Sequence, residues 1–363
     1  MSGSQSLTPV THRQIRLATR PVGYPTESDF RLVESSVPEP GAGEFLVRVV
    51  YLSLDPYMRG RMSDARSYVP PVALGDVMEG GTVGEVVRSS HPGFAVGDVV
   101  EGRLGWQEYA VSAGKGVRRI DPTAAPISTA LGVLGMPGLT AYFGLLEVGQ
   151  PKPGETVVVS AASGAVGGLV GQIAKLKGCR AVGLAGSDAK VDYLTRELGY
   201  DAGINYRTAP DLDAALRAAC PGGIDVYFDN VGGRITEAVS RHVNMFARFA
   251  VCGLISQYNL TEPELAPRNE RFVLVNRVRI QGFLVFDFAA RYKEGLAQLT
   301  EWVREGKLKY KEDVVDGLER APGALIGLLQ GRNFGKVVVR VGPDPAAART
   351  PGAAAGGRAE RRR

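Results

Sequence analysis

Cysteine and histidine are scarce in this chain, which has three of each in 363 residues. The cysteines lie far apart, so the sequence contains no CxxC pair and no disulfide framework of the kind that small secreted domains use. A catalytic zinc needs several Cys, His, Asp or Glu ligands brought together, and scattered residues do not predict such a cluster. We therefore expect no metal site and a reducing compartment. The residues are Cys179, Cys220, Cys252, His12, His91 and His242.

Long apolar runs are absent as well. No stretch is long enough to span a bilayer, and the first residues lack the charged-then-apolar pattern of a secretory signal. We therefore expect a cytoplasmic protein without membrane contact. Much of the formal net charge of +5 comes from the tail Arg358–Arg363. An exposed basic terminus is more often solvated than a binding site, and no stripe of basic and aromatic residues predicts a nucleic-acid partner.

A strand, a small-residue turn and a helix follow one another in the middle of the chain. The β-branched run Thr156–Ser160 leads into Ala161-Ala-Ser-Gly164-Ala-Val-Gly167-Gly168, and an apolar helical spacing follows. Such a unit lets backbone N–H groups approach the pyrophosphate of a dinucleotide at the positive end of a helix. Alanine takes the first glycine position, and small residues after a buried strand can also serve close packing alone.

The rest of the chain divides around this unit. Strand-like alternation and turns dominate up to residue 135, whereas strands and helices alternate over 136–305, which predicts βαβ crossovers and a parallel sheet. The strand-like run Gly335–Val341 has no crossover partner nearby, so residues 306–342 are expected to return to the β domain. We expect disorder in residues 1–12 and in the basic tail 343–363. The predicted class is α/β, with a β substrate domain (13–135) and a doubly wound nucleotide-binding sheet (136–305).

The end of the second strand of this sheet bears on the choice of cofactor. NAD-binding folds place an acidic residue there for the ribose hydroxyls, but this strand ends Leu184-Ala-Gly-Ser187, and Asp188 follows as a helix-start residue. Lys190 comes two positions later. A lysine near the end of this strand, without a carboxylate, attracts the 2′-phosphate of the cofactor, which favours NADP(H) over NAD(H). A lysine that is only solvated on its helix would give the same sequence pattern.

The turn Asp55-Pro-Tyr-Met-Arg59 follows a predicted strand in the β domain. Asp-Pro favours a turn, which would place Tyr57 near the neighbouring side chains at a strand end. The residues alone leave two interpretations open, a packed aromatic turn and a cleft wall with a phenolic surface.

Several spaced motifs together give the chain a specific resemblance over roughly Arg13 to Val341. It resembles the zinc-independent branch of the medium-chain dehydrogenase/reductases, and in particular the leukotriene hydroxydehydrogenase/prostaglandin reductases and plant alkenal double-bond reductases. Where zinc-dependent relatives carry metal ligands, this chain has Leu54-Asp55 and Met78-Glu79-Gly80. The motifs are Leu54-Asp-Pro-Tyr-Met-Arg59, Gly135-Met-Pro-Gly-Leu-Thr140, Ala161-Ala-Ser-Gly-Ala-Val-Gly167, Phe228-Asp-Asn-Val-Gly-Gly233, Cys252-Gly-Leu-Ile-Ser-Gln-Tyr-Asn259 and Asn333-Phe-Gly-Lys336.

The resemblance implies a GroES-like β domain joined to a Rossmann domain, and a set of site residues. The turn would hold the pyrophosphate, a lysine and a tyrosine the 2′-phosphate, and backbone groups the nicotinamide carboxamide. Tyr258 would lie at the reacting end of the cofactor, and Tyr57 would line the substrate pocket. The implied cofactor residues are Met136, Thr140, Gly164, Ala165, Val166, Gly167, Ser187, Lys190, Tyr206, Asn230, Cys252, Gly253, Leu254, Ile255, Ser256, Tyr258, Phe283, Leu284, Val285 and Asn333.

The activity implied is NADPH-dependent reduction of the carbon–carbon double bond of an α,β-unsaturated ketone or aldehyde, without zinc. Tyr258 is the candidate donor to the carbonyl oxygen, where negative charge develops. Two alternatives stay open, a quinone reductase on the same scaffold and a catalytically silent NADP-binding protein. The family also implies a homodimer, which the run Val278–Val285 could form as an exposed sheet edge.

Overall fold

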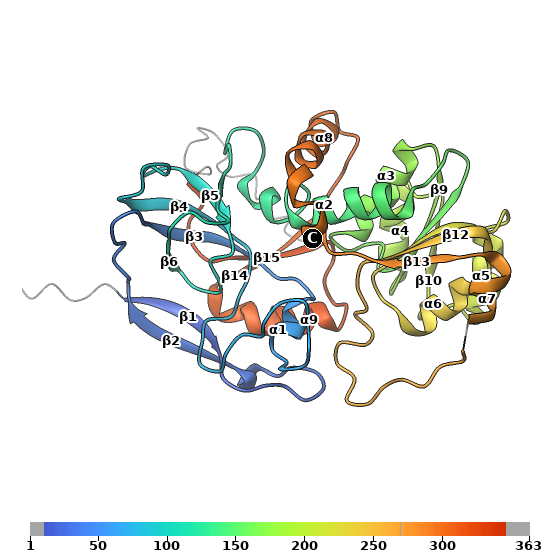
Figure 1. The fold of residues 1–363 in the computed structure, drawn as a ribbon, viewed down its shortest axis with the longest axis horizontal. Coiled ribbons are helices and arrows are strands. Elements are labelled where there is room, and N and C mark those ends of the chain that lie inside the picture. The colour runs from blue at the N-terminus through green and yellow to red at the C-terminus, as the bar shows by residue number, and fades with distance from the viewer. Residues whose placement is uncertain (1–10, 269, 346–363) are drawn as a thin grey trace, which may run out of the picture.

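Two sheets of different construction organise the residues that the computed structural model describes, which are 11–268 and 270–345 (Figure 1). The first sheet is parallel and has the strand order β10-β9-β8-β11-β12-β13. This is the 3-2-1-4-5-6 order of a doubly wound nucleotide-binding sheet, so the predicted fold class is confirmed. Its strands are β8 (Thr156–Val159), β9 (Arg180–Ala185), β10 (Ala202–Asn205), β11 (Ile224–Asp229), β12 (Val243–Val251) and β13 (Arg279–Gly282).

The parallel sheet is covered on both faces because its strands alternate apolar side chains between the two sides. Val157 and Val159 of β8 belong to one apolar core, and Val158 between them belongs to another. Helices of the first core are α2 (Met136–Phe143), α3 (Gly167–Leu176), α4 (Asp188–Arg196) and α8 (Tyr292–Arg304), and those of the second are α5 (Leu212–Ala219), α6 (Gly233–Ser240) and α7 (Glu270–Asn276).

The second sheet is mixed and draws on both ends of the chain. Its order is β14-β15-β3-β4-β5-β7, with β6 also paired to β3. Val338 of β15 pairs with Ser53 of β3, which brings a late strand beside an early one. A separate hairpin and two helices complete this unit. The elements are β1 (Thr11–Leu17), β2 (Phe30–Ser36), β3 (Phe45–Ser53), β4 (Thr82–Ser89), β5 (Val99–Gly102), β6 (Tyr109–Ser112), β7 (Arg118–Arg119), β14 (Glu312–Asp316), β15 (Lys336–Arg340), α1 (Met58–Arg61) and α9 (Ala321–Leu329).

Short helical segments link these elements, and one of them ends a predicted strand earlier than expected. The run Val278–Val285 is only partly a strand, because β13 ends at Gly282 and the segment η4 begins at Val285. The backbone N–H of Leu284 donates to a carboxylate oxygen of Asp287 (2.9 Å), which starts the helical turn. The segments are η1 (Glu27–Asp29), η2 (Ile127–Leu131), η3 (Gly144–Gly149, π-helical), η4 (Val285–Arg291) and η5 (Leu318–Arg320).

A buried tyrosine fixes the first turns of α3 against the parallel sheet. The Tyr200 hydroxyl donates to the carbonyl of Gly167 (2.5 Å) and accepts from the N–H of Gly171 (3.1 Å). Glycine is required at 171, because a Cβ there would lie 1.9 Å from Cζ of the Tyr200 ring. The start of α3, which follows the glycine turn, is therefore held in one position by the core behind it.

Parts of both ends that we predicted to be disordered are ordered in the structure. Thr11 and His12 belong to β1, where they pair with Ser36 and Ser35, and the buried His12 ring accepts from the backbone N–H of Tyr109 (3.3 Å). At the other end the carbonyl of Pro343 accepts from Arg48 (3.0 Å), and Tyr51 donates to Asp344 (3.2 Å). These backbone and side-chain partners order both segments. The remainder of both expectations, 1–10 and 346–363, lies outside the described residues.

Within the described parts of the chain, no helix combines the length and apolarity needed to cross a membrane.

Candidate active site

The turn between β8 and α3 forms a cradle that only small residues permit. A Cβ on Gly167 would lie 2.4 Å from the carbonyl oxygen of Ala161, and Ala161 itself has a positive φ of 48°. A Cβ on the adjacent Gly168 would meet nothing nearer than a Leu198 methyl at 3.4 Å. The constraint therefore falls on the position that faces the turn. Without a side chain at this position, backbone N–H groups of the turn and of the start of α3 are accessible to an anion.

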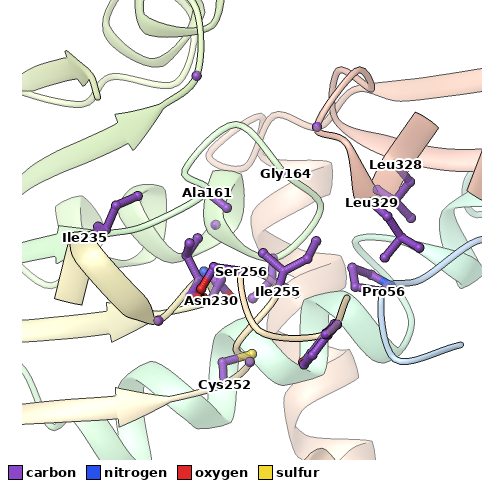
Figure 2. Close-up of a pocket in the computed structure, with 18 of the residues that line it drawn as sticks. Pro56, Ala161, Gly164, Asn230, Ile235, Cys252, Ile255, Ser256, Leu328 and Leu329 are labelled. Atoms are coloured by element: carbon purple, nitrogen blue, oxygen red, sulfur yellow. Dashed lines mark hydrogen bonds between the residues drawn. The ribbon is translucent and has the colours of Figure 1, made fainter. Parts of the chain in front are cut away.

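This turn lies on a cavity of about 1370 Å³ that is lined from both sheets. Figure 2 shows Pro56, Leu328 and Leu329 at one end of the view and Ile235 of α6 at the other, with Gly164 and other labelled residues between them. The predicted residues on its wall are Tyr57, Met136, Thr140, Gly164, Ala165, Val166, Gly167, Lys190, Tyr206, Asn230, Cys252, Gly253, Ile255, Ser256, Tyr258, Phe283, Leu284, Val285 and Asn333.

Ser187 and Leu254 are the two predicted cofactor residues that do not line the cavity. Ser187 is the N-cap of α4, and its hydroxyl accepts from the backbone N–H of Lys190 (3.4 Å). The Leu254 side chain lies over Gly232, where a Cβ would come 2.9 Å from its methyl carbon, and its backbone N–H donates to the Tyr258 hydroxyl (3.2 Å). Both residues support neighbours on the wall.

A buried carboxylate shapes the turn after β11, next to the glycine cradle. One oxygen of Asp229 accepts from the backbone N–H groups of Val231 and Gly232 (2.9 Å each) and from the Ser160 hydroxyl (3.1 Å). The Asn230 amide donates to the carbonyl of Ser160 (2.8 Å), which ties this turn to the one before α3. Asp229 thus orients two cavity walls and is not itself on the surface of the cavity.

Cations and a phenol gather where β9 and β10 end. Tyr206 and Arg207 follow β10, and a Cβ on Gly186 would lie 3.1 Å from the Tyr206 hydroxyl and 3.2 Å from Nε of Arg207. Lys190 of α4 donates to the carbonyl of Gly331 (2.8 Å). Burial lowers the pKa of Lys190, and the like charge of Arg207 lowers it further. Lys190 and Arg207 therefore place two cationic side chains at this end of the cavity, where they can contact an anion.

Tyr258 also lines the cavity, beside Cys252 and Gly253. A Cβ on Gly253 would lie 3.1 Å from the Tyr258 hydroxyl. Burial raises the pKa of Tyr258, and burial raises the pKa of the Cys252 thiol to about 12. At neutral pH the phenol therefore keeps its proton and can donate a hydrogen bond, while the thiol stays protonated.

Aromatic rings and guanidinium groups form the arm of the cavity nearest the mixed sheet. The buried Arg61 guanidinium lies 4.6 Å from the centre of the Tyr68 ring and 5.6 Å from that of Tyr57. It is neutralised by Glu79 (2.5 Å). The Phe286 ring lies 6.4 Å from the Tyr68 ring. Tyr57 thus lines the cavity and also packs against the Arg61 cation. Both interpretations of this turn, a packed aromatic turn and a cleft wall, therefore hold.

A buried ion pair closes the floor of this arm. Lys336 of β15 donates to a carboxylate oxygen of Asp55 (3.0 Å) and to the carbonyl of Leu54 (2.7 Å), and the Ser53 hydroxyl donates to the other Asp55 oxygen. The two side chains are 4% and 8% exposed. The pair joins β15 to the end of β3 in the region where zinc-dependent relatives are expected to carry metal ligands.

Several wall residues were not predicted from the sequence. Arg207 directly follows the predicted Tyr206, and the charge argument applied to Lys190 could have found it. Tyr68 lies in a loop without a motif, and Phe286 follows the predicted Val285 by one position. Arg61 and Arg103 also line this arm, and Arg103 lies 4.8 Å from the centre of the Phe286 ring. No local pattern places these last residues together.

The wall fits a dinucleotide in shape and in polar chemistry. The cradle excludes a Cβ at 167, and the side-chain oxygen Oε1 of Gln330 is buried with no hydrogen-bond partner among the described residues. An acceptor of this kind suits a ribose hydroxyl or an amino group. Among residues 11–268 and 270–345, no group of three or more His, Cys, Asp or Glu is placed to hold a metal ion. Fold and site together define a two-domain, dinucleotide-dependent oxidoreductase.

Comparison with known proteins places the chain more narrowly. Residues 13–120 match the family model described as the N-terminal domain of oxidoreductase, and 165–302 match the model described as zinc-binding dehydrogenase. The chain is 51% identical to the NADPH-dependent curcumin reductase of Escherichia coli over 92% of this chain and 98% of that protein. It is 46% identical to the 2-alkenal reductase (NADP(+)-dependent) of Nicotiana tabacum, with the same coverage of 92% and 98%.

A solved structure agrees with these relatives. The crystal structure of CurA from Vibrio vulnificus in complex with NADPH superposes with a TM-score of 0.88 at 50% identity, covering 92% of this chain and 100% of that one. The chain belongs to the medium-chain dehydrogenase/reductase family, in its zinc-independent branch of alkenal and prostaglandin reductases.

Proposed function

We propose that this protein is an NADPH-dependent reductase of the carbon–carbon double bond of α,β-unsaturated ketones and aldehydes. The observation that carries the proposal is one continuous cavity, which joins a dinucleotide cradle to an aromatic arm and has a protonated phenol, Tyr258, on its wall. The relatives at 46–51% identity are named as NADPH-dependent or NADP-dependent reductases of curcumin and 2-alkenals, which supports both the cofactor and the substrate class.

The cofactor NADP(H), when bound, supplies the hydride that such a reduction requires. The residues proposed to hold it line the cavity. Backbone groups of the cradle would take the pyrophosphate, Lys190 and Tyr206 the 2′-phosphate, and the backbone of Phe283–Val285 the carboxamide. The other residues proposed to hold the cofactor also line the cavity, and they are Met136, Thr140, Asn230, Cys252, Gly253, Ile255, Ser256 and Asn333.

The chain's own residues have two tasks in this account. The Tyr258 hydroxyl donates to the substrate carbonyl oxygen and stabilises the negative charge that develops there as an enolate. Tyr57 and Tyr68 line the arm in which the rest of the substrate lies, and their rings exclude water from it. The α-carbon then takes a proton from solvent or from a tyrosine. No strong acid is needed, because position and charge stabilisation supply most of the effect.

A substrate and cofactor panel tests the proposal. NADPH oxidation would be followed by absorbance with a medium-chain enal, an aromatic enone, a quinone and a saturated aldehyde, each repeated with NADH and with a chelator. We expect turnover of the enal and enone with NADPH, with chelator having no effect. Turnover of the quinone alone would favour the quinone reductase alternative. Binding of NADPH without any turnover would favour a catalytically silent binding protein.

We also propose a homodimer formed through the edge of the parallel sheet. All four residues of β13 are exposed, and among the described residues this strand pairs only with β12. The neighbouring elements β12 and α7 carry exposed apolar side chains, with Phe246 at 61% and Leu274 at 77% exposure. Such a patch beside an open strand edge suits a second copy. Light scattering that gave the mass of a monomer would exclude it.

A cytoplasmic location is proposed from the chemistry of the thiols. Cys179, Cys220 and Cys252 are all free in the structure, as expected in a reducing compartment. Fractionation that recovered the protein from an oxidising compartment would contradict this proposal.

A further inference from the structure

Two cations at the nucleotide end of the cavity contact the other structural unit. Lys190 Nζ donates to the carbonyl of Gly331 (2.8 Å), and Arg207 donates through Nη2 to the carbonyl of Gln330 (3.4 Å). Gln330 and Gly331 are the first residues after α9, a helix that packs in the apolar core of the mixed-sheet unit. The contact therefore bridges the parallel-sheet unit and the C-terminus of α9.

The two cations are only partly balanced by the protein, because the carboxylate of Asp313 attracts Lys190 from beyond ion-pair distance. In the described ranges, neither Lys190 nor Arg207 has a carboxylate within ion-pair distance. The nearest acidic residue in sequence, Asp188, accepts a hydrogen bond from the Asn205 amide (2.7 Å) and does not line the cavity. The partial negative charge at a helix C-terminus amounts to roughly half an elementary charge, which offsets only part of two full cations.

The groups around the two cations suit an anionic group that is attached to a sugar with free hydroxyl groups. Gly186 leaves the floor open under the Tyr206 hydroxyl and the Arg207 guanidinium, both just over 3 Å from where a Cβ would stand. Gln330, whose carbonyl accepts from Arg207, also presents the buried side-chain oxygen that has no donor among the described residues. A phosphate monoester on a ribose would bring two negative charges to the cations and hydroxyl groups near that oxygen.

We propose that Arg207 is a specificity-determining residue which, together with Lys190, holds the 2′-phosphate of NADP(H) against the C-terminus of α9. The inference rests on the proposed function for the identity of the cofactor and adds a second cation and a second structural unit to the phosphate site. NAD(H) lacks this phosphate, so Lys190 and Arg207 add nothing to its affinity. Arg207 should therefore discriminate between the two cofactors.

Binding of NADP⁺, NAD⁺ and adenosine 2′,5′-bisphosphate, measured by calorimetry, tests this without turnover. Arg207→Gln should weaken NADP⁺ and the bisphosphate about tenfold to a hundredfold, the range for a charge-assisted hydrogen bond, and leave NAD⁺ within about twofold. Arg207→Lys should recover part of the loss. Arg217→Gln on the exposed surface of α5 is the matched control and should change neither.

A second measurement, on the wild-type protein, tests whether the bound 2′-phosphate stabilises the C-terminus of α9. Hydrogen exchange in the segment 321–332 should slow when NADP⁺ saturates the protein and should slow less when NAD⁺ does. Unchanged NADP⁺ binding by Arg207→Gln, or equal weakening of NADP⁺ and NAD⁺, would overturn the inference. A protein that binds NADP⁺ through Arg207 but reduces no enone would overturn the proposed function and leave this inference standing.

Discussion

Replacing Tyr258 by phenylalanine is expected to lower kcat for an enone about a hundredfold, with the dissociation constant for NADPH changed less than about twofold. Loss of one donor to a developing oxyanion typically costs on the order of 3 kcal/mol. The structure places this hydroxyl on the cavity wall, where it accepts from the N–H of Leu254 (3.2 Å) and so keeps its own proton for a substrate. Steady-state kinetics and NADPH fluorescence would measure the two quantities.

The pH dependence of the same step follows from the direction of the pKa shift. Burial disfavours the phenolate and raises the pKa of Tyr258, so the donating form is present below that raised value. We therefore expect no fall in kcat from this hydroxyl between about pH 6 and 9. Tyr109→Phe, at a tyrosine of β6 that does not line the cavity, is the control. Full turnover by Tyr258→Phe would remove this residue from the mechanism.

Replacing Lys336 by methionine is expected to lower the free energy of unfolding by about 3–5 kcal/mol, because it leaves the buried Asp55 carboxylate without its cation. Lys336 is 4% exposed and contacts both Asp55 and the Leu54 carbonyl. Burial lowers its pKa and the attraction of Asp55 opposes that shift, so the partner is what keeps the charge in place. Urea titration would measure the change.

A second variant separates the ion pair from simple packing. Lys336→Met combined with Asp55→Asn removes the unpaired charge while the amide can still accept from Ser53. This double variant should regain a substantial part of the lost stability. Lys115→Met, at an exposed lysine, should change stability by less than about 0.5 kcal/mol. A double variant no more stable than Lys336→Met alone would show that the pair contributes little.

The sequence was most informative where one local pattern dictates one structure. The strand, turn and helix around Gly164 and Gly167 are local, and the alternation of strands and helices after it defines a parallel sheet with its known handedness. The same reasoning fails at segment ends. Thr11 and His12 look polar and free in sequence, but pairing with β2 and the Tyr109 N–H orders them.

The unpredicted part of the site comes from contacts between distant segments. Tyr68, Arg61 and Phe286 meet only because the folded chain brings the loop that carries Tyr68 beside η4. The family resemblance places Ser187 at the cofactor, two residues after the end of β9, but its hydroxyl is used as the cap of α4. A sequence pattern shows which residues are near a site along the chain, whereas packing decides which of them face it.

These contacts connect the fold to the proposed chemistry in a simple way. The parallel sheet and the Tyr200 contact hold the cradle rigid at the start of α3. The mixed sheet brings Tyr57 and the Lys336–Asp55 pair to the same cavity from both ends of the chain. The substrate arm therefore depends on strand pairing between β3 and β15 as much as on the residues of the arm itself.

The position of hydride addition tests the central claim most directly. An aromatic enone would be reduced with NADPH deuterated at the transferred position, and the product examined by NMR. The account predicts a saturated ketone with deuterium on the former β-carbon. Deuterium on the carbonyl carbon of an allylic alcohol would contradict it, because the enzyme would then reduce the carbon–oxygen bond in place of the alkene.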